Sequence, residues 1–327
     1  MKVAIAGAGI SGAYLYRMLH DRGCTVHLYE QPQKNVCGLT SCAWGSSLEI
    51  VTFLDEAGLN AEDYILRRFD HLLMDEVRLR ADLLTIDKPR LIRDLLQDAE
   101  LRYSSLPLKD YDRVIDATGA TRALLPQPAD DLVLDCCQFM VQSDKPLPSR
   151  VRLGGIGYAW SLPLGNRNYH IGCGSLLMDP RRHLDELGWL VEGNQRIICN
   201  CKGKIRLTAP HLSQPFVAAI QNTEVWGIGE AIGCVAPLAG EGIVPGLRSV
   251  QLLLESWDDP EQYRQAVLDE FLWMAEERAI IEQLRLGGSI GLRQARTVHR
   301  NSRRLGLQIG LRNAFALLQK LGRMTSG

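Results

Sequence analysis

Three glycines and one glutamate near the N-terminus have the spacing of a nucleotide-binding site. Gly7, Gly9 and Gly12 follow the apolar run at residues 3–6, and a segment with helical apolar spacing comes directly after them. Gly7 permits a tight turn, Gly9 lets the backbone approach a pyrophosphate, and Gly12 lets the helix pack closely on the strand. Glu30 ends the next apolar segment, where its carboxylate can accept hydrogen bonds from a ribose. We therefore predict a dinucleotide site on a β-α-β unit.

A second glycine-rich loop lies much further along the chain. It contains Pro237, Gly240 and Gly242 and leads at Ile243 into a predicted helix, after a buried strand followed by Glu230. The N-terminus of such a helix can stabilise negative charge on a reduced flavin ring. No second strand with G-x-G-x-x-G is present, so we expect no separate pyridine nucleotide domain. The pattern favours FAD as the cofactor, and a simple loop is the alternative for residues 237–242.

These motifs need a particular set of elements to position them. A capping box at Ser46 and Glu49 predicts a helix to about residue 58, and Asp87 caps another helix with Pro89 in its first turn. Residues 114–118 read as a buried strand that ends at Gly119. Short strands separated by Pro and Gly follow to about residue 220, and the chain after residue 260 reads as helical.

We therefore predict an α/β fold with a Rossmann-like FAD-binding domain, an inserted, mainly antiparallel β-sheet domain for substrate, and a helical C-terminal segment. The predicted boundaries are 1–125 and 222–257 for the first domain, 126–221 for the second, and 258–327 for the C-terminal segment. A chain of 327 residues is long enough for two domains.

The combined motifs resemble the FAD-dependent oxidoreductases of the para-hydroxybenzoate hydroxylase type. Two further features resemble the geranylgeranyl reductase family within that group: Cys37-Gly38, and Tyr158-x-Trp160-x-Leu-Pro followed by Gly172-x-Gly174. The resemblance implies a flavoprotein that reduces carbon–carbon double bonds in the isoprenoid chains of lipids. Glu230 stands where the family usually has Asp, and Lys88 where an Arg is common.

The same resemblance implies roles for individual residues. Cys37 would lie beside the flavin and donate a proton or tune the ring, and an inert buried thiol is the alternative. Tyr158 and Trp160 would line the substrate tunnel, and ordinary inter-domain core is the alternative. The residues expected to hold FAD are Gly7, Gly9, Gly12, Glu30, Gly38, Gly119, Glu230, Pro237, Gly240, Gly242 and Ile243.

Other functions remain compatible with these motifs. A flavin-dependent monooxygenase or halogenase shares the cofactor residues, and a flavoprotein for electron transfer or assembly would as well. Because no second nucleotide-binding domain is expected, the electron donor would dock transiently as a ferredoxin, a deazaflavin or NAD(P)H. The nine cysteines form no zinc-type pattern, and a metal or redox pair at Cys199 and Cys201 has no second ligand cluster nearby, so we expect no metal site.

The charge distribution singles out the C-terminal segment. The chain has 37 basic and 38 acidic residues, which gives a formal net charge of −1 and no reason to expect a nucleic acid partner. After Glu282 there is no acidic residue, whereas the rest of the chain has 28 basic against 38 acidic residues. The nine basic residues of this tail are Arg285, Arg293, Arg296, Arg300, Arg303, Arg304, Arg312, Lys320 and Arg323.

Apolar residues accompany these cations, namely Leu305, Ile309, Leu317, Leu318 and Leu321. We predict that residues 285–323 lie on an anionic membrane or an acidic protein, and packing on the chain's own acidic body is the alternative. The N-terminus resembles no secretory signal, and no run approaches the ~18–20 apolar residues of a membrane-spanning helix. We expect a cytoplasmic protein that contacts a membrane only at its surface.

Overall fold

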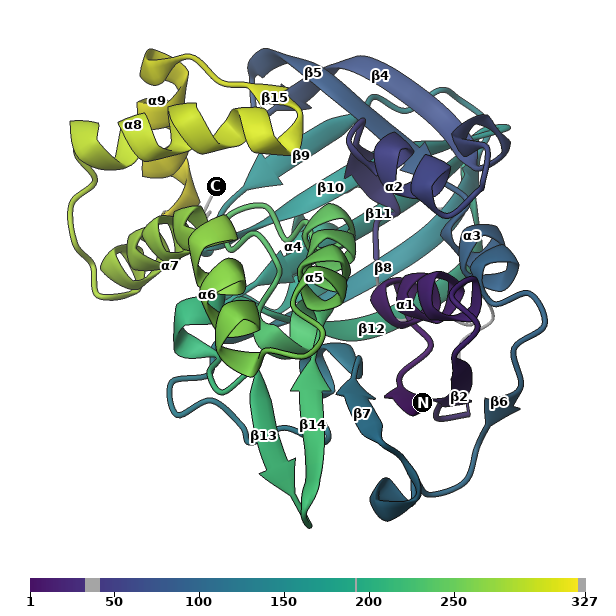
Figure 1. The fold of residues 1–327 in the computed structure, drawn as a ribbon. Helices are drawn as coiled ribbons and strands as arrows, with labels where there is room; N and C mark the ends of the chain where they lie inside the picture. The colour runs from purple at the N-terminus through teal and green to yellow at the C-terminus, as the bar shows by residue number, and fades with distance from the viewer. Residues whose placement is uncertain (33–41, 192, 323–327) are drawn as a thin grey trace.

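The chain folds around two β-sheets with helices packed between and beside them (Figure 1). The computed structural model describes residues 1–32, 42–191 and 193–322. The α/β class and the second, mainly antiparallel sheet agree with the fold predicted from the sequence.

The first sheet is built on the predicted β-α-β unit. In the described part of the chain its strand order is β13-β14-β7-β1-β2-β6, and only the β13–β14 pair is antiparallel. Helix α1 (Ile10–His20) makes the crossover that parallel strands β1 and β2 require. The strands are β1 (Lys2–Ala6), β2 (Thr25–Tyr29), β6 (Leu101–Arg102), β7 (Arg113–Asp116), β13 (Val217–Ile220) and β14 (Thr223–Gly227).

Helices α1, α3 (Lys88–Leu95) and α5 (Ile243–Glu255) accompany this sheet. Helix α3 begins as predicted, because the Asp87 side chain accepts a hydrogen bond from the backbone N–H of Arg90 at 3.1 Å. The predicted capping box at Ser46 is wrong. Ser46 lies in strand β3 (Gly45–Ser47), whose backbone pairs with β5, and helix α2 (Ile50–Glu56) starts only after it.

The second sheet is larger and runs in the order β12-β8-β11-β10-β9-β4-β5-β15, with β3 also paired to β5. Its described pairs are antiparallel except β4 with β9. The remaining strands are β4 (Ile65–Met74), β5 (Val77–Ile86), β8 (Val133–Ser143), β9 (Arg150–Leu153), β10 (Gly157–Gly165), β11 (Asn168–Ser175), β12 (Gln195–Arg206) and β15 (Leu307–Gln308). Helix α4 (Pro180–Glu186) packs on β8 and β11.

Strand pairing does not follow the predicted domain boundaries. The β4–β5 hairpin lies within residues 1–125, yet it extends the second sheet. Conversely, β13 lies within residues 126–221 but pairs with β14 in the first sheet. Local spacing in the sequence predicts no element over residues 59–86, because the pairing of β4 with the distant strand β9 depends on residues far apart in the chain.

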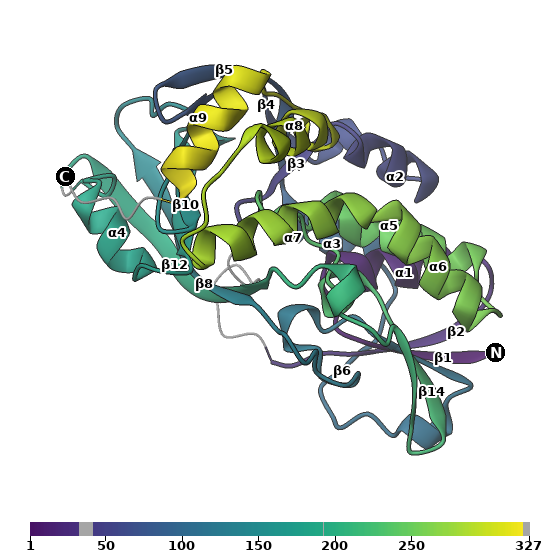
Figure 2. The same ribbon diagram turned by 90° about the vertical axis from the view of Figure 1, so that its left-hand side faces the viewer.

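The C-terminal segment is mostly helical, as predicted. Its helices are α6 (Pro260–Glu270), α7 (Leu272–Arg285), α8 (Leu292–Asn301) and α9 (Leu311–Leu321). Between α8 and α9 the chain adds the short strand β15 to β5, with Leu307 opposite Ala81. Figure 2 shows α8 and α9 at the β4–β5 end of the second sheet, with α7, α5 and α6 in a row below them. None of the helices in the described ranges combines the length and apolar character needed to cross a membrane.

Candidate active site

Most of the residues singled out in the sequence line one cavity of about 1100 Å³. The cavity is bordered by the first sheet, the second sheet and the C-terminal helices. Gly12 lies behind its wall, and Pro237 precedes the lining residue Leu238. Cys37 and Gly38 lie outside the described residues. The predicted residues that line the cavity are Gly7, Gly9, Glu30, Gly119, Tyr158, Trp160, Glu230, Gly240, Gly242 and Ile243.

Packing around the turn between β1 and α1 explains its glycines. Gly7 has φ +103°, and a Cβ atom there would lie 2.3 Å from the carbonyl oxygen of Ala117. A Cβ atom at Gly12 would lie 2.0 Å from the carbonyl oxygen of Gly7. In contrast, no atom lies within 4 Å of a Cβ placed on Gly9, which lines the cavity. The turn therefore keeps open space beside Gly9, where the sequence analysis places a pyrophosphate.

Glu30 lies beside this turn. One carboxylate oxygen accepts a hydrogen bond from the backbone N–H of Ala8 at 2.7 Å, and the other accepts one from Gln31 at 2.7 Å. Each oxygen retains a lone pair, so the carboxylate can still accept a hydrogen bond from a ribose hydroxyl. The N-terminus of α1 has no acidic residue in its first turn and no side-chain cap, which leaves its N–H groups available to an anion.

A second turn, after β7, brings Gly119 next to Glu230. The Asp116 carboxylate organises this turn by accepting hydrogen bonds from the backbone N–H groups of Thr118, Leu124 and Leu125. A Cβ atom on Gly119 would lie 3.4 Å from a carboxylate oxygen of Glu230. Glu230 itself accepts a hydrogen bond from the backbone N–H of Arg206 at 2.8 Å, and burial raises the pKa of its carboxyl.

The glycine loop before α5 contains a carboxylate that the sequence analysis did not assign. One oxygen of Glu241 accepts hydrogen bonds from the backbone N–H groups of Ile243 and Val244, both at 3.0 Å. These are the first donors of α5, so the expected anion site already holds the chain's own carboxyl group. Burial raises the pKa of Glu241 to about 7. The sequence contained a signal for this contact, because an acidic residue just before a helix can accept hydrogen bonds from the free N–H groups at the start of the helix.

The aromatic motif and the later glycines fit together across two strands. Trp160 lies opposite Gly172, and Tyr158 lies opposite Gly174, in the antiparallel pair β10–β11. A Cβ atom on Gly172 would lie 2.2 Å from the Trp160 ring, so the glycine makes room for the indole. The Tyr158 hydroxyl donates a hydrogen bond to the carbonyl oxygen of Ala239 in the glycine loop. Both aromatic side chains line the cavity, as the tunnel hypothesis requires.

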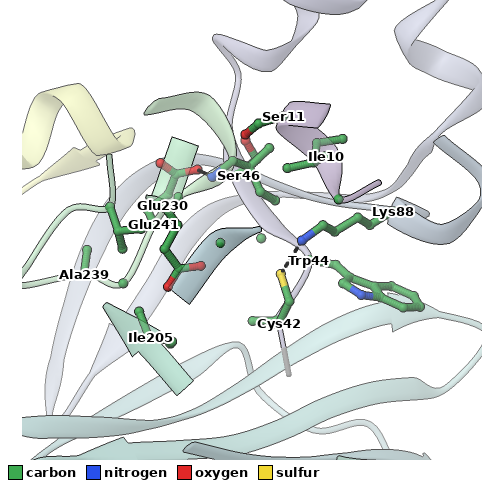
Figure 3. Close-up of a pocket in the computed structure, with 18 of the residues that line it drawn as sticks. Ile10, Ser11, Cys42, Trp44, Ser46, Lys88, Ile205, Glu230, Ala239 and Glu241 are labelled. Atoms are coloured by element: carbon green, nitrogen blue, oxygen red, sulfur yellow. Dashed lines mark hydrogen bonds between the residues drawn. The ribbon is translucent and has the colours of Figure 1, made fainter. Parts of the chain in front are cut away.

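A lysine and a thiol meet on another wall of the cavity. The ammonium group of Lys88 donates a hydrogen bond to the sulfur of Cys42 at 3.2 Å (Figure 3). Lys88 also lowers the pKa values of Glu230 and Glu241 through its charge, although burial outweighs it at both. Gln138 donates a hydrogen bond to the Cys42 carbonyl oxygen at 2.8 Å and accepts one from the Trp160 indole at 3.3 Å. Within the described ranges, no group of His, Cys, Asp and Glu could hold a metal ion.

The cavity continues into an aliphatic chamber between the second sheet and the C-terminal helices. Side chains from β4, β5 and β9 line one part of it, and side chains from α8 to α9 line another. The apolar residues named in the sequence analysis for membrane contact face this interior: Ile309, Leu317, Leu318 and Leu321 are 3–7% exposed, and Leu305 is partly buried. Their predicted place on a membrane-facing surface is therefore wrong, because they cover the second sheet instead.

Several tail cations pair with acidic residues of the body. Arg300 forms an ion pair with Glu276, and Lys320 forms one with Glu76. Arg285 pairs with Glu282 at 3.0 Å. These contacts correspond to the alternative in which the tail packs on the chain's own acidic body.

The residues present fit FAD. The open space at Gly9, the carboxylate of Glu30 and the bare N-terminus of α1 suit an adenosine and its pyrophosphate. The glycine loop at the start of α5 lies in the same cavity and suits a flavin ring. The first N–H donors of α5 already bind the Glu241 carboxylate. Fold and site together are those of a Rossmann-like nucleotide-binding protein whose cavity suits FAD.

No family model matches the chain. An uncharacterised protein of Methanocaldococcus jannaschii, MJ1182, is 26% identical, with 77% of this chain and 82% of that protein covered.

Solved structures share the fold at low identity. A geranylgeranyl bacteriochlorophyll reductase-like protein from Thermoplasma acidophilum has a TM-score of 0.69 at 16% identity, covering 86% of this chain and 87% of that one. A tryptophan 6-halogenase from Streptomyces toxytricini has a TM-score of 0.66 at 14% identity, covering 98% and 90%. The chain thus has the fold shared by geranylgeranyl reductase-like proteins and flavin-dependent halogenases, and the prediction of FAD agrees with these neighbours.

Proposed function

We propose that the chain is an FAD-dependent reductase that saturates carbon–carbon double bonds in isoprenoid chains of the geranylgeranyl type. The observation that carries this proposal is the aliphatic chamber, which continues from the glycine loop of the cofactor site. Its walls include Leu72, Met74, Leu153, Leu307, Leu317 and Leu318. A chain of repeated branched hydrocarbon units suits such walls, because its burial there needs no polar partners.

The chain's own residues would have three tasks in this reaction. The aliphatic walls would exclude water and hold the double bond in line with the flavin ring, which lowers the entropic part of the barrier. Tyr158 would hold the glycine loop in place through its bond to Ala239. Reduced FAD, when bound, supplies the hydride that an alkene needs.

Anaerobic single turnover tests the proposal. Protein reconstituted with FAD is reduced with dithionite, freed of excess reductant and mixed with geranylgeraniol. We expect the flavin to reoxidise without oxygen and the product to gain two hydrogens for each flavin reoxidised, as measured by mass spectrometry. A reduced flavin that oxygen reoxidises but that no isoprenoid chain can oxidise would contradict the proposal.

A flavin-dependent monooxygenase or halogenase is the second candidate. The structural likeness to the tryptophan 6-halogenase, which covers 98% of this chain, favours it. An absolute requirement for oxygen, with incorporation of oxygen or halide into a small aromatic substrate, would support this function and exclude alkene reduction.

The reductant is proposed as a partner that docks transiently. A ferredoxin, a deazaflavin and NAD(P)H differ in the charge and size of the surface that they need. Each is mixed in reduced form with the oxidised holoprotein, and loss of the flavin absorbance identifies the donor. A flavoprotein for electron transfer alone would bleach with a donor and then fail to reduce any isoprenoid.

A further inference from the structure

One carboxyl group lies in the C-terminal wall of the cavity. Among the described lining residues that follow Ile243, Glu277 on α7 is the only one with a titratable side chain. The other lining residues of this part of the chain are Val298, Ser302, Leu305, Leu307, Ile309, Leu317, Leu318 and Leu321. Glu277 is 2% exposed. Burial of a carboxyl group in such surroundings costs free energy, so its presence calls for an explanation.

Burial favours the neutral form of Glu277, whereas its two hydrogen bonds favour the charged form. One oxygen accepts a bond from the backbone N–H of Leu238 at 3.3 Å, and the other accepts one from the Asn301 side-chain amide at 3.3 Å. Two long bonds satisfy only part of what a charged carboxylate can accept. Burial, with a smaller contribution from the charge of Glu276, raises the pKa of Glu277 to about 7 despite the hydrogen bonds from Leu238 and Asn301. A substantial share of the protein therefore has a proton on this group at neutral pH.

Glu277 is also tied to the cofactor loop. Its partner Leu238 comes directly before Ala239 and Gly240, the part of the loop that Tyr158 contacts from β10. The carboxyl group thus lies where the aliphatic chamber meets the loop expected to carry the flavin ring. A group at this junction can reach a double bond held next to the ring.

Other polar side chains of the cavity are less suited to giving up a proton. The Tyr158 hydroxyl proton is engaged with Ala239, and burial raises the pKa of Tyr158. Glu241 is held against the first donors of α5, on the cofactor side of the loop. Lys88 reaches Cys42 on a different wall.

We propose that Glu277 is the acid of the reaction and gives its carboxyl proton to one alkene carbon while the hydride is transferred to the other. This inference rests on the proposed function. The π bond breaks and two C–H bonds form, so the substrate is reduced and the reduced cofactor is oxidised. Glu277 is left as a carboxylate and takes a proton from water before the next turnover.

The first test compares Glu277→Gln with wild type in the anaerobic single turnover. Glutamine keeps the shape of the side chain but cannot donate a proton of suitable acidity. General acids contribute roughly 10²–10⁴-fold, so we expect at least a roughly hundredfold slower reoxidation of the flavin by the isoprenoid. Glu255→Gln, at the exposed C-terminal end of α5 and outside the lining of the cavity, is the control and should react as wild type does.

The outcomes separate the two proposals. If wild type and Glu277→Gln reduce the isoprenoid equally fast and with the same pH profile, the role of Glu277 is overturned and the proposed function stands. A wild-type protein that reduces no isoprenoid overturns the proposed function and this inference with it. If Glu277→Gln does not fold, Glu277→Asp is tested instead. This variant should reoxidise the flavin more slowly than wild type but with the same dependence on pH. A reoxidation rate that does not change with pH would overturn the proposal.

A second readout needs no turnover. Infrared difference spectra of the protein should show the carbonyl band of a protonated carboxyl group that disappears as the pH rises through about 7. The band should be weaker in Glu277→Gln, where Glu241 still contributes to it, and unchanged in Glu255→Gln. A spectrum at pH 6 that is the same in wild type and Glu277→Gln would overturn the neutral carboxyl on which the proton transfer depends.

Discussion

The indole ring of Trp160 occupies the space that a side chain at Gly172 would need. The two residues lie opposite each other in β10 and β11, and a Cβ atom on Gly172 would come within 2.2 Å of the ring. The pair connects two sequence motifs that lie apart in the chain, and it places the aromatic ring against the cavity.

Gly172→Ala should therefore destabilise the protein. The added methyl group forces the ring of Trp160 or the strand to move, and overpacking of this kind costs about 1–3 kcal/mol. Thermal unfolding followed by circular dichroism measures the effect. Gly310→Ala is the control, because a Cβ atom there meets no atom within 4 Å. Equal melting temperatures for Gly172→Ala and wild type would contradict the contact.

Glu241 should oppose FAD binding when it is charged. Its carboxylate competes for the N–H groups of Ile243 and Val244, and its pKa is raised to about 7. Affinity for FAD should rise as the pH falls from 8 to 6, and Glu241→Gln should bind about tenfold more tightly than wild type at pH 8. Flavin fluorescence quenching measures both. Glu255→Gln, at the exposed C-terminal end of the same helix, should change neither value.

The buried Glu277 should make stability fall as the pH rises. Its folded-state pKa of about 7 lies above the ordinary value of 4.5, so the folded protein holds the proton more tightly than the unfolded chain does. The protonated Glu277 therefore contributes to the free energy of unfolding fully below about pH 4.5, and this contribution is lost as the pH rises to about 7. For a shift of that size it amounts to about 3 kcal/mol. Urea unfolding at several pH values should show wild type losing stability relative to Glu277→Gln across this window. A difference that stays constant with pH would contradict the shift.

Membrane binding by the tail should depend on charge rather than on the apolar stripe. Arg293, Arg296, Arg303 and Arg312 are exposed, whereas the apolar stripe is buried except at the partly buried Leu305. Replacing the four arginines by Gln should weaken co-sedimentation with phosphatidylserine vesicles by about fivefold for each charge. Phosphatidylcholine vesicles are the control. Wild type that binds phosphatidylserine vesicles no better than the variant does, or no better than phosphatidylcholine vesicles, would contradict a membrane contact driven by charge.

The sequence by itself determined the features that depend on neighbours along the chain. The β1-α1-β2 unit, the turn at Gly7 and the Asp87 cap follow from residue spacing, since a tight turn or a helix cap is a matter of a few adjacent dihedral angles and donors. The aromatic residues of β10 could be assigned to one face of a strand for the same reason. These features were enough to predict the fold class.

Only the tertiary structure decided which surfaces become interior. The β4–β5 hairpin joins the second sheet through β9, and the tail's leucines cover that sheet, because pairing over long sequence separations depends on what the whole chain can bury. Glu241 and Glu277 look like ordinary acids in the sequence. Burial gives both a pKa near 7, since a charge removed from water loses its solvation whatever its neighbours in sequence are.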